Sequence, residues 1–561
     1  MSASSALAAI AQQYFDDKVA SNPFTASTFG VTGYDHQVPD PSRDADSRRL
    51  DQISATRDQL SELDADALVG QDRITFSMLQ RLLDDEVAML GANLGDVAVT
   101  ASFSGVATRI FSQVPNIGLH SEQRSNDYLQ RLSKLPGYFD AYLERYREAA
   151  DQGRHQTKHG VETAIAQIEE YLDSDLETDT FLRPEPQDVD VELWRSKAKK
   201  IITTEIRPAL TRFKDVLEAE LLSSARGNDQ VGITHVPGGD DGYRAAIRQF
   251  TTTDLPPEEI HQIGLDIVAK LRVEFSEVGE RALGISDPDE VMDRLRTDKS
   301  LRYSSGEEIV EDVTAVLRAA EAEVPNWFHP YDIAPCDVKE VPASIAKGST
   351  LGYYSPPSQD GSRPGTYWIN TYDPTSRTRF EYEALSFHES VPGHHFQFAL
   401  GQVLNDLPDF RRFSYVTAFG EGWGLYTERL ANEMGLYTSD LGRLGMLSFD
   451  AWRACRLVVD TGMHAFGWSR EQAIKFMTRN SALSDINIAN EVDRYIAWPG
   501  QALAYMIGRR HIGQLRDKAE KALGDDFNIK DFHHHILTSG SVPLVTMTEI
   551  VDEWLAQAAS A

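Results

Sequence analysis

One short segment of the chain contains the residue types of a hydrolytic metal site. The segment FHESVPGHHFQ, residues 387–397, places His388 directly before Glu389, and two further histidines follow a few residues later. Imidazole nitrogens bind zinc, and a neighbouring carboxylate can act as general base toward a water molecule. In the common zinc-peptidase motif the second histidine follows the first by four residues on a helix. That position is Pro392 here, so a metal site requires one of the later histidines.

Neither later histidine is well placed if the helix continues without a break. His395 would share the face of His388 but lie about 10 Å further along the axis, and His394 would be turned away by about 120°. Pro392 cannot donate the helical hydrogen bond, and Gly393 tolerates backbone angles that other residues avoid. We therefore predict a break that returns a later histidine to His388. We prefer His394, because a Gly-His pair also ends the motif in zinc peptidases with ordinary spacing, and His395 is the alternative.

A third ligand is expected downstream, in the segment AFGEGWGLYTERL at residues 418–430. Glu421 lies between two glycines at the predicted start of a helix, and Glu428 follows seven residues later on the same face. In zinc sites with two histidines, a glutamate from a following helix can complete the ligand set, and a second carboxylate often orients a ligand histidine. We predict Glu421 as the third ligand and Glu428 as the partner of a ligand histidine. A solvated Glu428 beside Arg429 is the alternative.

The segments that carry these residues resemble a known family. Together with RLVVDTGMHAFGWSREQA (456–473) and RYIAWPGQALAYMIG (494–508), they are similar to the bacterial family called domain of unknown function 885, which has a His-Glu-x-x-Pro-Gly-His-His motif. That family looks related to the thimet oligopeptidase/neurolysin and thermostable carboxypeptidase groups of zinc peptidases. The resemblance implies a mainly α, zincin-like architecture with a deep groove and zinc at its floor.

The first of these additional segments places three polar residues on one helix face. Arg456, Asp460 and His464 follow one another at four-residue intervals. His464 could donate a hydrogen bond to a developing oxyanion, with Asp460 fixing its tautomer. The alternative is a structural ladder of ion pairs.

The second additional segment contains Arg494, Gly500, Gln501 and Tyr505. Neurolysin-like enzymes have a similar C-terminal stretch in which a tyrosine faces the zinc. The likeness implies that Tyr505 stabilises the oxyanion and that Arg494 binds a substrate carboxylate through two hydrogen bonds. The alternative is that Tyr505 is an ordinary core residue of an amphipathic helix.

A second histidine-rich segment, DFHHHILTSGSVPL at residues 531–544, also invites a metal interpretation. It contains His533, His534 and His535 in direct succession. Adjacent side chains on a helix point in different directions, so we interpret these three histidines as capping, packing or surface residues.

Most of the elements that must position these residues are predicted to be helices. Segments 73–90, 191–222 and 260–279 repeat apolar residues at intervals of three and four, which is typical of amphipathic helices. Segment 337–374 differs, because it is rich in Gly, Pro, Ser and Tyr and contains the short strand-like runs VKEV, LGYY and TYWINTY. We predict a small β-sheet there, directly before the helix of His388.

The predicted organisation has two parts. Residues 1–235 form an N-terminal helical region that packs on the catalytic half, and residues 236–561 form the catalytic zinc-peptidase-like region. No fixed-period repeat indicates a solenoid.

The composition narrows the function classes. The net charge of −31 repels phosphate backbones, so nucleic acid is a poor partner. No stretch approaches the roughly 18 apolar residues of a membrane span, and the N-terminus lacks the pattern of a signal peptide. Cys336 and Cys455 form no disulfide framework. We expect a cytoplasmic protein that acts without membrane or nucleic acid.

These observations predict a zinc-dependent hydrolase, a metallopeptidase acting on oligopeptides or small amides. Glu389 would take a proton from the attacking water and pass it to the leaving amine. The alternatives are a zinc amidase acting on a non-peptide metabolite and a non-catalytic metal- or peptide-binding protein.

Overall fold

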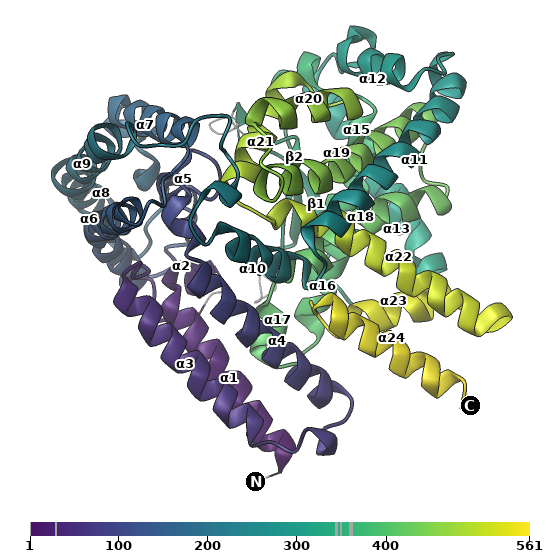
Figure 1. Ribbon diagram of the computed structural model, residues 1–561, viewed down its shortest axis with the longest axis horizontal. Coiled ribbons are helices and arrows are strands. Elements are labelled where there is room, and N and C mark those ends of the chain that lie inside the picture. The colour runs from purple at the N-terminus through teal and green to yellow at the C-terminus, as the bar shows by residue number, and fades with distance from the viewer. Residues whose placement is uncertain (1, 29–30, 343–345, 348–349, 358–362, 561) are drawn as a thin grey trace.

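The structure is a computed structural model that describes residues 2–28, 31–342, 346–347, 350–357 and 363–560. It is mainly helical with one small sheet, which confirms the predicted mainly α class (Figure 1). The helices of the N-terminal half are α1 (Ala3–Ser21), α2 (Pro23–Thr28), α3 (Arg43–Ser61), α4 (Gln71–Ala92), α5 (Val106–Gln113), α6 (Glu122–Asp151), α7 (Lys158–Asp173), α8 (Val191–Ile201), α9 (Arg207–Val216), α10 (Gly239–Thr251), α11 (Pro257–Leu283), α12 (Pro288–Thr297) and α13 (Gly306–Trp327).

The C-terminal half, which follows the sheet, is also built from helices. Its helices are α15 (Glu381–Glu389), α16 (His394–Val403), α17 (Asp409–Phe413), α18 (Thr417–Glu433), α19 (Asp440–His464), α20 (Arg470–Asn480), α21 (Asp485–Ala497), α22 (Ala504–Leu523), α23 (Ile529–Leu537) and α24 (Leu544–Ala558). Within the part of the chain that the structure describes, none of the helices is both long and apolar enough to cross a membrane.

Apolar helix faces build two separate cores. Helices α6 to α9, on the left in Figure 1, pack around buried aromatic residues such as Phe139, Trp194 and Phe213. Helices α1, α3 and α4 instead contribute Tyr14 and Met78, among others, to the large core shared with the C-terminal half. The predicted division of the chain at residue 235 stays a prediction.

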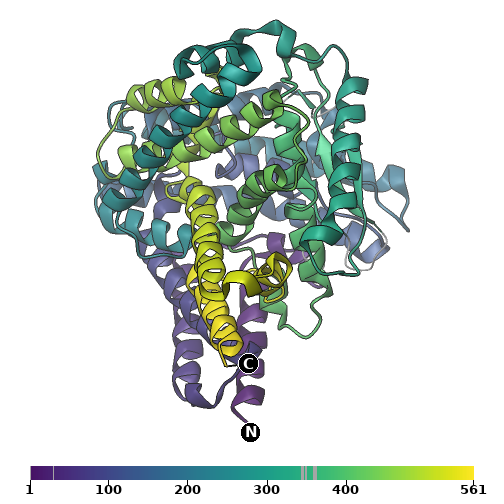
Figure 2. The ribbon, with the colours of Figure 1, turned by 90° about the vertical axis from the view of Figure 1, so that its right-hand side faces the viewer.

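One buried arginine joins the N-terminal helices to the C-terminal half. The Arg411 guanidinium on α17 donates to the carbonyl of Gln71 and the hydroxyl of Thr75 at the start of α4, each at 3.2 Å. It also donates to the carbonyl of Ser539. Figures 1 and 2 show the start of α1 and the end of α24 at the same end of the molecule. Through Arg411, segments that are far apart in the sequence meet at the start of α4.

The predicted small sheet is present. Its strands are β1 (Cys336–Glu340), β2 (Gly352–Ser355) and β3 (Gly365–Ile369), in the order β1-β3-β2. Strand β3 pairs in parallel with β1 and antiparallel with β2. Parts of the predicted region, residues 343–345, 348–349 and 358–362, lie outside the described residues. The sheet directly precedes α15, the helix that carries His388.

Two helix pairs hold the C-terminal half together. Helix α11 packs along α19, and α18 packs along α22. The second pair approaches closely at two glycines, because a Cβ atom on Gly422 would lie 2.6 Å from the Cα of Gly508. This crossing brings the first turn of α18, with Glu421, toward the first turn of α22, with Tyr505.

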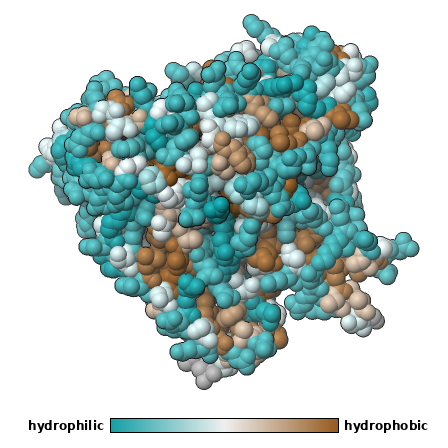
Figure 3. Space-filling view, viewed as in Figure 1, coloured by the Kyte–Doolittle hydropathy of each residue, from teal (hydrophilic) through white to brown (hydrophobic). Residues whose placement is uncertain are grey.

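The visible surface is mostly hydrophilic. Figure 3 shows that hydrophilic residues cover most of one face, with apolar residues in separate patches. The net charge of −31 keeps such a surface well solvated.

Candidate metal centre

The chain breaks its helix between the two halves of the histidine motif. Helix α15 ends at Glu389 and α16 begins at His394, so residues 390–393 form a turn. Gly393 lies so close to the preceding turn that a Cβ atom there would be 2.0 Å from the carbonyl oxygen of His388. In a continuous helix His394 would point away from His388, and the turn brings it back toward that residue. As a result, the ring centroids of His388 and His394 lie 4.6 Å apart.

Glu421 completes a cluster with these two histidines. Its Oε2 atom lies 3.5 Å from Nε2 of His388 and 3.5 Å from Nε2 of His394. All three ligand atoms lie within 4.8 Å of one another. Ligands about 2.0–2.1 Å from a tetrahedral zinc ion are separated by about 3.3 Å. The side chains are therefore arranged at a spacing that a zinc ion fits.

His395, the alternative ligand, points away from the cluster. Its Nδ1 lies 3.1 Å from the hydroxyl of Tyr354 in β2, and its Nε2 lies 2.9 Å from the carbonyl oxygen of Ala334. Burial lowers the pKa of His395 to about 4, so the ring is neutral at pH 7 and donates from Nε2. His394 is the histidine that the turn brings beside His388.

Glu428 lies on the other side of the His388 ring, two helical turns after Glu421 on the same face of α18. Its Oε1 accepts a 2.8 Å hydrogen bond from Nδ1 of His388, and the side chain is fully buried. This contact directs Nε2 of the ring toward Glu421, as expected for the partner of a ligand histidine. Burial opposes protonation of His388, but Glu421 and Glu428 outweigh it and raise its pKa to about 9. The solvated alternative for Glu428 is therefore wrong.

The Glu421 carboxylate is held in its charged form. Burial alone would raise its pKa, but the two histidines outweigh burial and hold the pKa well below the usual range. The hydroxyl of Tyr415 donates to Oε1 of Glu421 at 2.8 Å. Sequence reasoning missed Tyr415, and its only signal was an aromatic residue shortly before the α18 start.

Glu389 is the free carboxylate beside the cluster. It is partly buried and forms no hydrogen bond with any residue that the structure describes. Burial raises its pKa, while the charges of His394 and His388 oppose the rise. A carboxylate with a raised pKa is a stronger base than an ordinary glutamate, as a general base requires.

Tyr505 faces the cluster from α22. Burial raises its pKa, and the negative charge of Glu421 raises it further. The Arg456 guanidinium lies 4.2 Å from the Tyr505 ring centroid. The hydroxyl forms no hydrogen bond among residues inside the described ranges, so it is free to donate to a ligand.

The structure does not bring His464 and Asp460 into the cluster. His464 accepts the backbone N–H of Ile233 at Nδ1 (3.1 Å) and donates from Nε2 to the carbonyl of Tyr495 (3.0 Å). Asp460 accepts from the hydroxyl of Tyr243 at 2.6 Å and from the backbone N–H of Gly500, not from His464. With both ring nitrogens bonded to the backbone, His464 has no proton to donate to an oxyanion.

Arg494 is also committed to neighbours within the fold. It donates to Oε2 of Glu491 at 2.9 Å and to Oε1 of Gln501 at 2.6 Å. Glu491 has its pKa held far below the usual range, because Arg494 and Arg456 outweigh the effect of its burial. Arg494, which was predicted to bind a substrate carboxylate, thus binds the carboxylate of Glu491 instead.

The chain matches one family model over residues 23–551, that of the bacterial proteins of unknown function designated DUF885. The chain belongs to the DUF885 family. The resemblance predicted from the motifs is confirmed to that extent. No curated protein matches the chain.

Two solved structures are similar to this DUF885 chain over nearly its whole length. One is described as "the putative lipoprotein from Colwellia psychrerythraea"; it has a TM-score of 0.91 and 27% identity, and the alignment covers 99% of this chain and 100% of that one. The other is described as "a putative lipoprotein of unknown function from Shewanella oneidensis", with a TM-score of 0.75, 18% identity and coverage of 97% and 99%. The second shows the fold alone. The cytoplasmic location expected for this chain stays a prediction.

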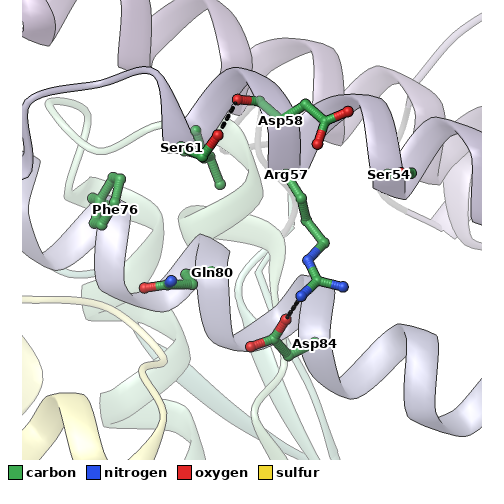
Figure 4. A pocket seen from close by; sticks show the side chains of 8 residues that line it. Ser54, Arg57, Asp58, Ser61, Phe76, Gln80 and Asp84 are labelled. Atoms are coloured by element: carbon green, nitrogen blue, oxygen red, sulfur yellow. Dashed lines mark hydrogen bonds and ion pairs between the residues drawn. The ribbon is translucent and has the colours of Figure 1, made fainter.

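Two surface cavities of the DUF885 chain lie away from the cluster of His388, His394 and Glu421. The first, of about 380 Å³, lies between α3 and α4, where Arg57 forms a 2.9 Å ion pair with Asp84 (Figure 4). The second, of about 340 Å³, lies between the start of α4 and α24. The residues lining them include none of the predicted site residues.

Proposed function

We propose that this DUF885 protein is a zinc-dependent hydrolase, a metallopeptidase that cleaves oligopeptides. One observation carries the proposal: His388, His394 and Glu421 converge at zinc spacing, and Glu389, the residue after His388, has no hydrogen-bonding partner among the described residues. Two imidazoles and one carboxylate leave a fourth position open, which is the arrangement of catalytic rather than structural zinc sites.

The donor set supports zinc over harder cations. Nitrogen ligands from two imidazoles favour zinc among the common metals, whereas calcium and magnesium prefer oxygen ligands. Glu428 adds the carboxylate–histidine contact that is typical of zinc sites. Zinc bound here would supply a Lewis acid that polarises the scissile carbonyl.

The protein groups around this position would perform the proton transfers. Glu389 takes a proton from the attacking water and delivers it to the leaving nitrogen, and burial, which raises its pKa, makes it a stronger base for the first step. The free hydroxyl of Tyr505 donates to the oxygen on which negative charge develops. Tyr415 holds the second oxygen of Glu421 and so fixes that ligand's orientation.

A relation to the thimet oligopeptidase and neurolysin group, with a zincin-like substrate groove, forms part of this proposal. The support is the shared order of elements: a His-Glu helix, then a helix with a glutamate ligand, then a C-terminal tyrosine near the metal. A non-catalytic binding protein would have no use for Glu389.

A zinc amidase acting on a small non-peptide metabolite is the second candidate. It is favoured by the enclosure of the cluster, since only 3% of the His388 side chain and 9% of the His394 side chain are exposed. Such a site admits a small amide more readily than a long chain.

Hydrolysis of a mixed peptide library tests the proposal. The purified protein is loaded with one equivalent of zinc, incubated with the library and compared with a chelator-treated sample. We expect zinc-dependent cleavage products. Zinc binding without cleavage of any peptide, but with hydrolysis of small amides, would instead support the amidase. Zinc binding with neither activity would support a binding protein.

A further inference from the structure

Arg453, on the face of α19 nearest the metal cluster, has no hydrogen-bonding partner within the described part of the chain. The residue is only 4% exposed, and its Nε and Nη1 atoms are both buried without a partner. The closest carboxylate oxygen, Oε1 of Glu428, lies 4.0 Å from Nη2, beyond hydrogen-bond distance. Buried charged donors are rarely left unpaired, because removing an ion from water is energetically costly.

Aromatic rings hold this guanidinium in place without satisfying its donors. Its central carbon lies 4.2 Å from the ring centroid of Trp452 and 4.5 Å from that of Phe449. The Tyr505 ring centroid lies 6.0 Å away. Stacking of this kind fixes the plane of the guanidinium and leaves its edge available to an acceptor.

One residue separates Arg453 from the candidate metal cluster. Oε1 of Glu428 lies 4.0 Å from Nη2 of Arg453 and accepts a 2.8 Å hydrogen bond from Nδ1 of His388. The central carbon of Arg453 also lies 6.0 Å from the ring centroid of Tyr505, the proposed oxyanion donor. A ligand acceptor that bonded Arg453 would therefore lie beside the reacting groups.

The neighbouring arginines, in contrast, donate hydrogen bonds to acceptors of the protein. Arg494 donates to Glu491 and Gln501, and Arg456 donates to Glu491 and to the hydroxyl of Tyr495. Arg456 keeps one buried donor, Nη1, without a partner. Of these three arginines, the chain thus bonds only Arg494 and Arg456 to a carboxylate, that of Glu491.

We propose that Arg453 binds a free carboxylate of the substrate, with Nη1 of Arg456 as a second donor. A planar guanidinium binds a carboxylate through two parallel hydrogen bonds, and that pairing would satisfy the donors that the fold leaves open. The substrate class is then a peptide whose C-terminal carboxylate lies next to the scissile bond, so the enzyme removes C-terminal residues. This inference rests on the proposed peptidase function and refines its substrate.

A matched pair of substrates tests the inference. The zinc-loaded enzyme is given an N-blocked dipeptide with a free C-terminus and, separately, the same dipeptide as its C-terminal amide. We expect kcat/KM to be about 10- to 100-fold higher for the free acid. This ratio corresponds to the contribution of a hydrogen bond to a charged group. Arg453→Met should remove that preference by lowering kcat/KM for the acid alone, and Arg453→Lys should retain part of it.

Arg443→Met is the control, because Arg443 lies on the same helix but pairs with Asp440 at its far end. It should leave the acid-to-amide ratio unchanged. The inference is overturned if the wild type cleaves acid and amide equally. It is also overturned if Arg453→Met and Arg453→Lys lower both rates together with the zinc content, since Arg453 would then only position Glu428.

A binding measurement separates this inference from the proposed function. If the wild type cleaves no peptide, calorimetry compares N-acetylphenylalanine with N-acetylphenylalanine amide on the zinc-loaded and zinc-free protein. A preference for the acid that Arg453→Met abolishes in both forms supports a carboxylate site in a protein that is not a peptidase. Equal binding of acid and amide overturns the site itself.

Discussion

Two segments of this chain place histidines side by side, and the structure uses them differently. In the first, the rings of His388 and His394 meet at Oε2 of Glu421. In the second, His533 lies 3.0 Å from the hydroxyl of Tyr426 and 2.9 Å from the carbonyl oxygen of Trp327, and His534 lies 2.9 Å from the hydroxyl of Tyr331.

The difference lies in what surrounds the histidines. The first segment contains a turn that brings two rings together, and a separate helix supplies a carboxylate between them. The second segment is the continuous helix α23, so its histidines point to different neighbours. For a candidate metal site, the number of histidines in a segment therefore matters less than a helix break combined with a carboxylate from another element.

Replacing one histidine in each segment should give the largest difference in zinc content between two variants. We expect His394→Ala to lose stoichiometric zinc and all hydrolytic activity, because two protein ligands do not hold the ion tightly. His534→Ala, the matched control, should retain one zinc per chain, and so should His395→Ala. Metal analysis after dialysis measures the zinc content. Retention of zinc by His394→Ala together with its loss from His395→Ala would reverse the ligand assignment.

Replacing the proposed base should separate metal binding from turnover. Glu389→Gln keeps the size of the side chain but cannot carry a proton between water and amine. We expect full zinc content and a fall in kcat of about 10²- to 10⁴-fold. Steady-state kinetics on a cleaved library peptide provides the measurement, and wild-type turnover in this variant would rule out the proposed role of Glu389.

Removing the charge of Glu428 should weaken the site without abolishing it. Glu428→Gln would still contact Nδ1 of His388 but as a neutral acceptor. We expect the zinc affinity to fall by about 10- to 100-fold, as for other partners of ligand histidines. Competition with a chromophoric chelator measures the affinity. An unchanged affinity would mean that the contact is only structural.

Zinc affinity should also depend on pH through His388. Its pKa of about 9 in the metal-free protein means that the ring is protonated at pH 7, whereas zinc binds the neutral form. As pH rises toward 9 the proton is lost, so the apparent affinity should increase by up to about tenfold per pH unit and level off above that pKa. Calorimetry in buffers of different ionisation enthalpy would detect the released proton. A flat profile between pH 6.5 and 9 (roughly the window set by the ordinary and shifted pKa values) would contradict it.

The smallest effect is expected in the second segment. His533→Ala removes two buried hydrogen bonds and should lower the free energy of unfolding by about 1–3 kcal/mol. Zinc content should not change, because the ring has no contact with the cluster among the residues described. Chemical denaturation measures the loss. Loss of zinc from a folded His533→Ala protein would mean that the two segments are coupled.

Periodicity and turn residues made the helical class, the small sheet and the helix break predictable. The proline and glycine in FHESVPGHHFQ indicated where the helix must end, but not the direction of the turn. The choice between His394 and His395 therefore depended on residues in and beside the sheet that contact His395. Tyr354 and Ala334 occupy both nitrogens of His395, and no local pattern places them there. Likewise, Asp460 and His464 lie four residues apart on one helix, as predicted, but they do not bond each other. Their hydrogen bonds go to residues from remote segments, Tyr243 for Asp460 and Ile233 for His464.

Anomalous diffraction at the zinc absorption edge, from crystals grown with one equivalent of zinc, tests the central claim most directly. The account predicts one strong peak bonded to Nε2 of His388, Nε2 of His394 and Oε2 of Glu421. A peak at His395 or at the histidines of α23, or no peak in a folded protein, would contradict it.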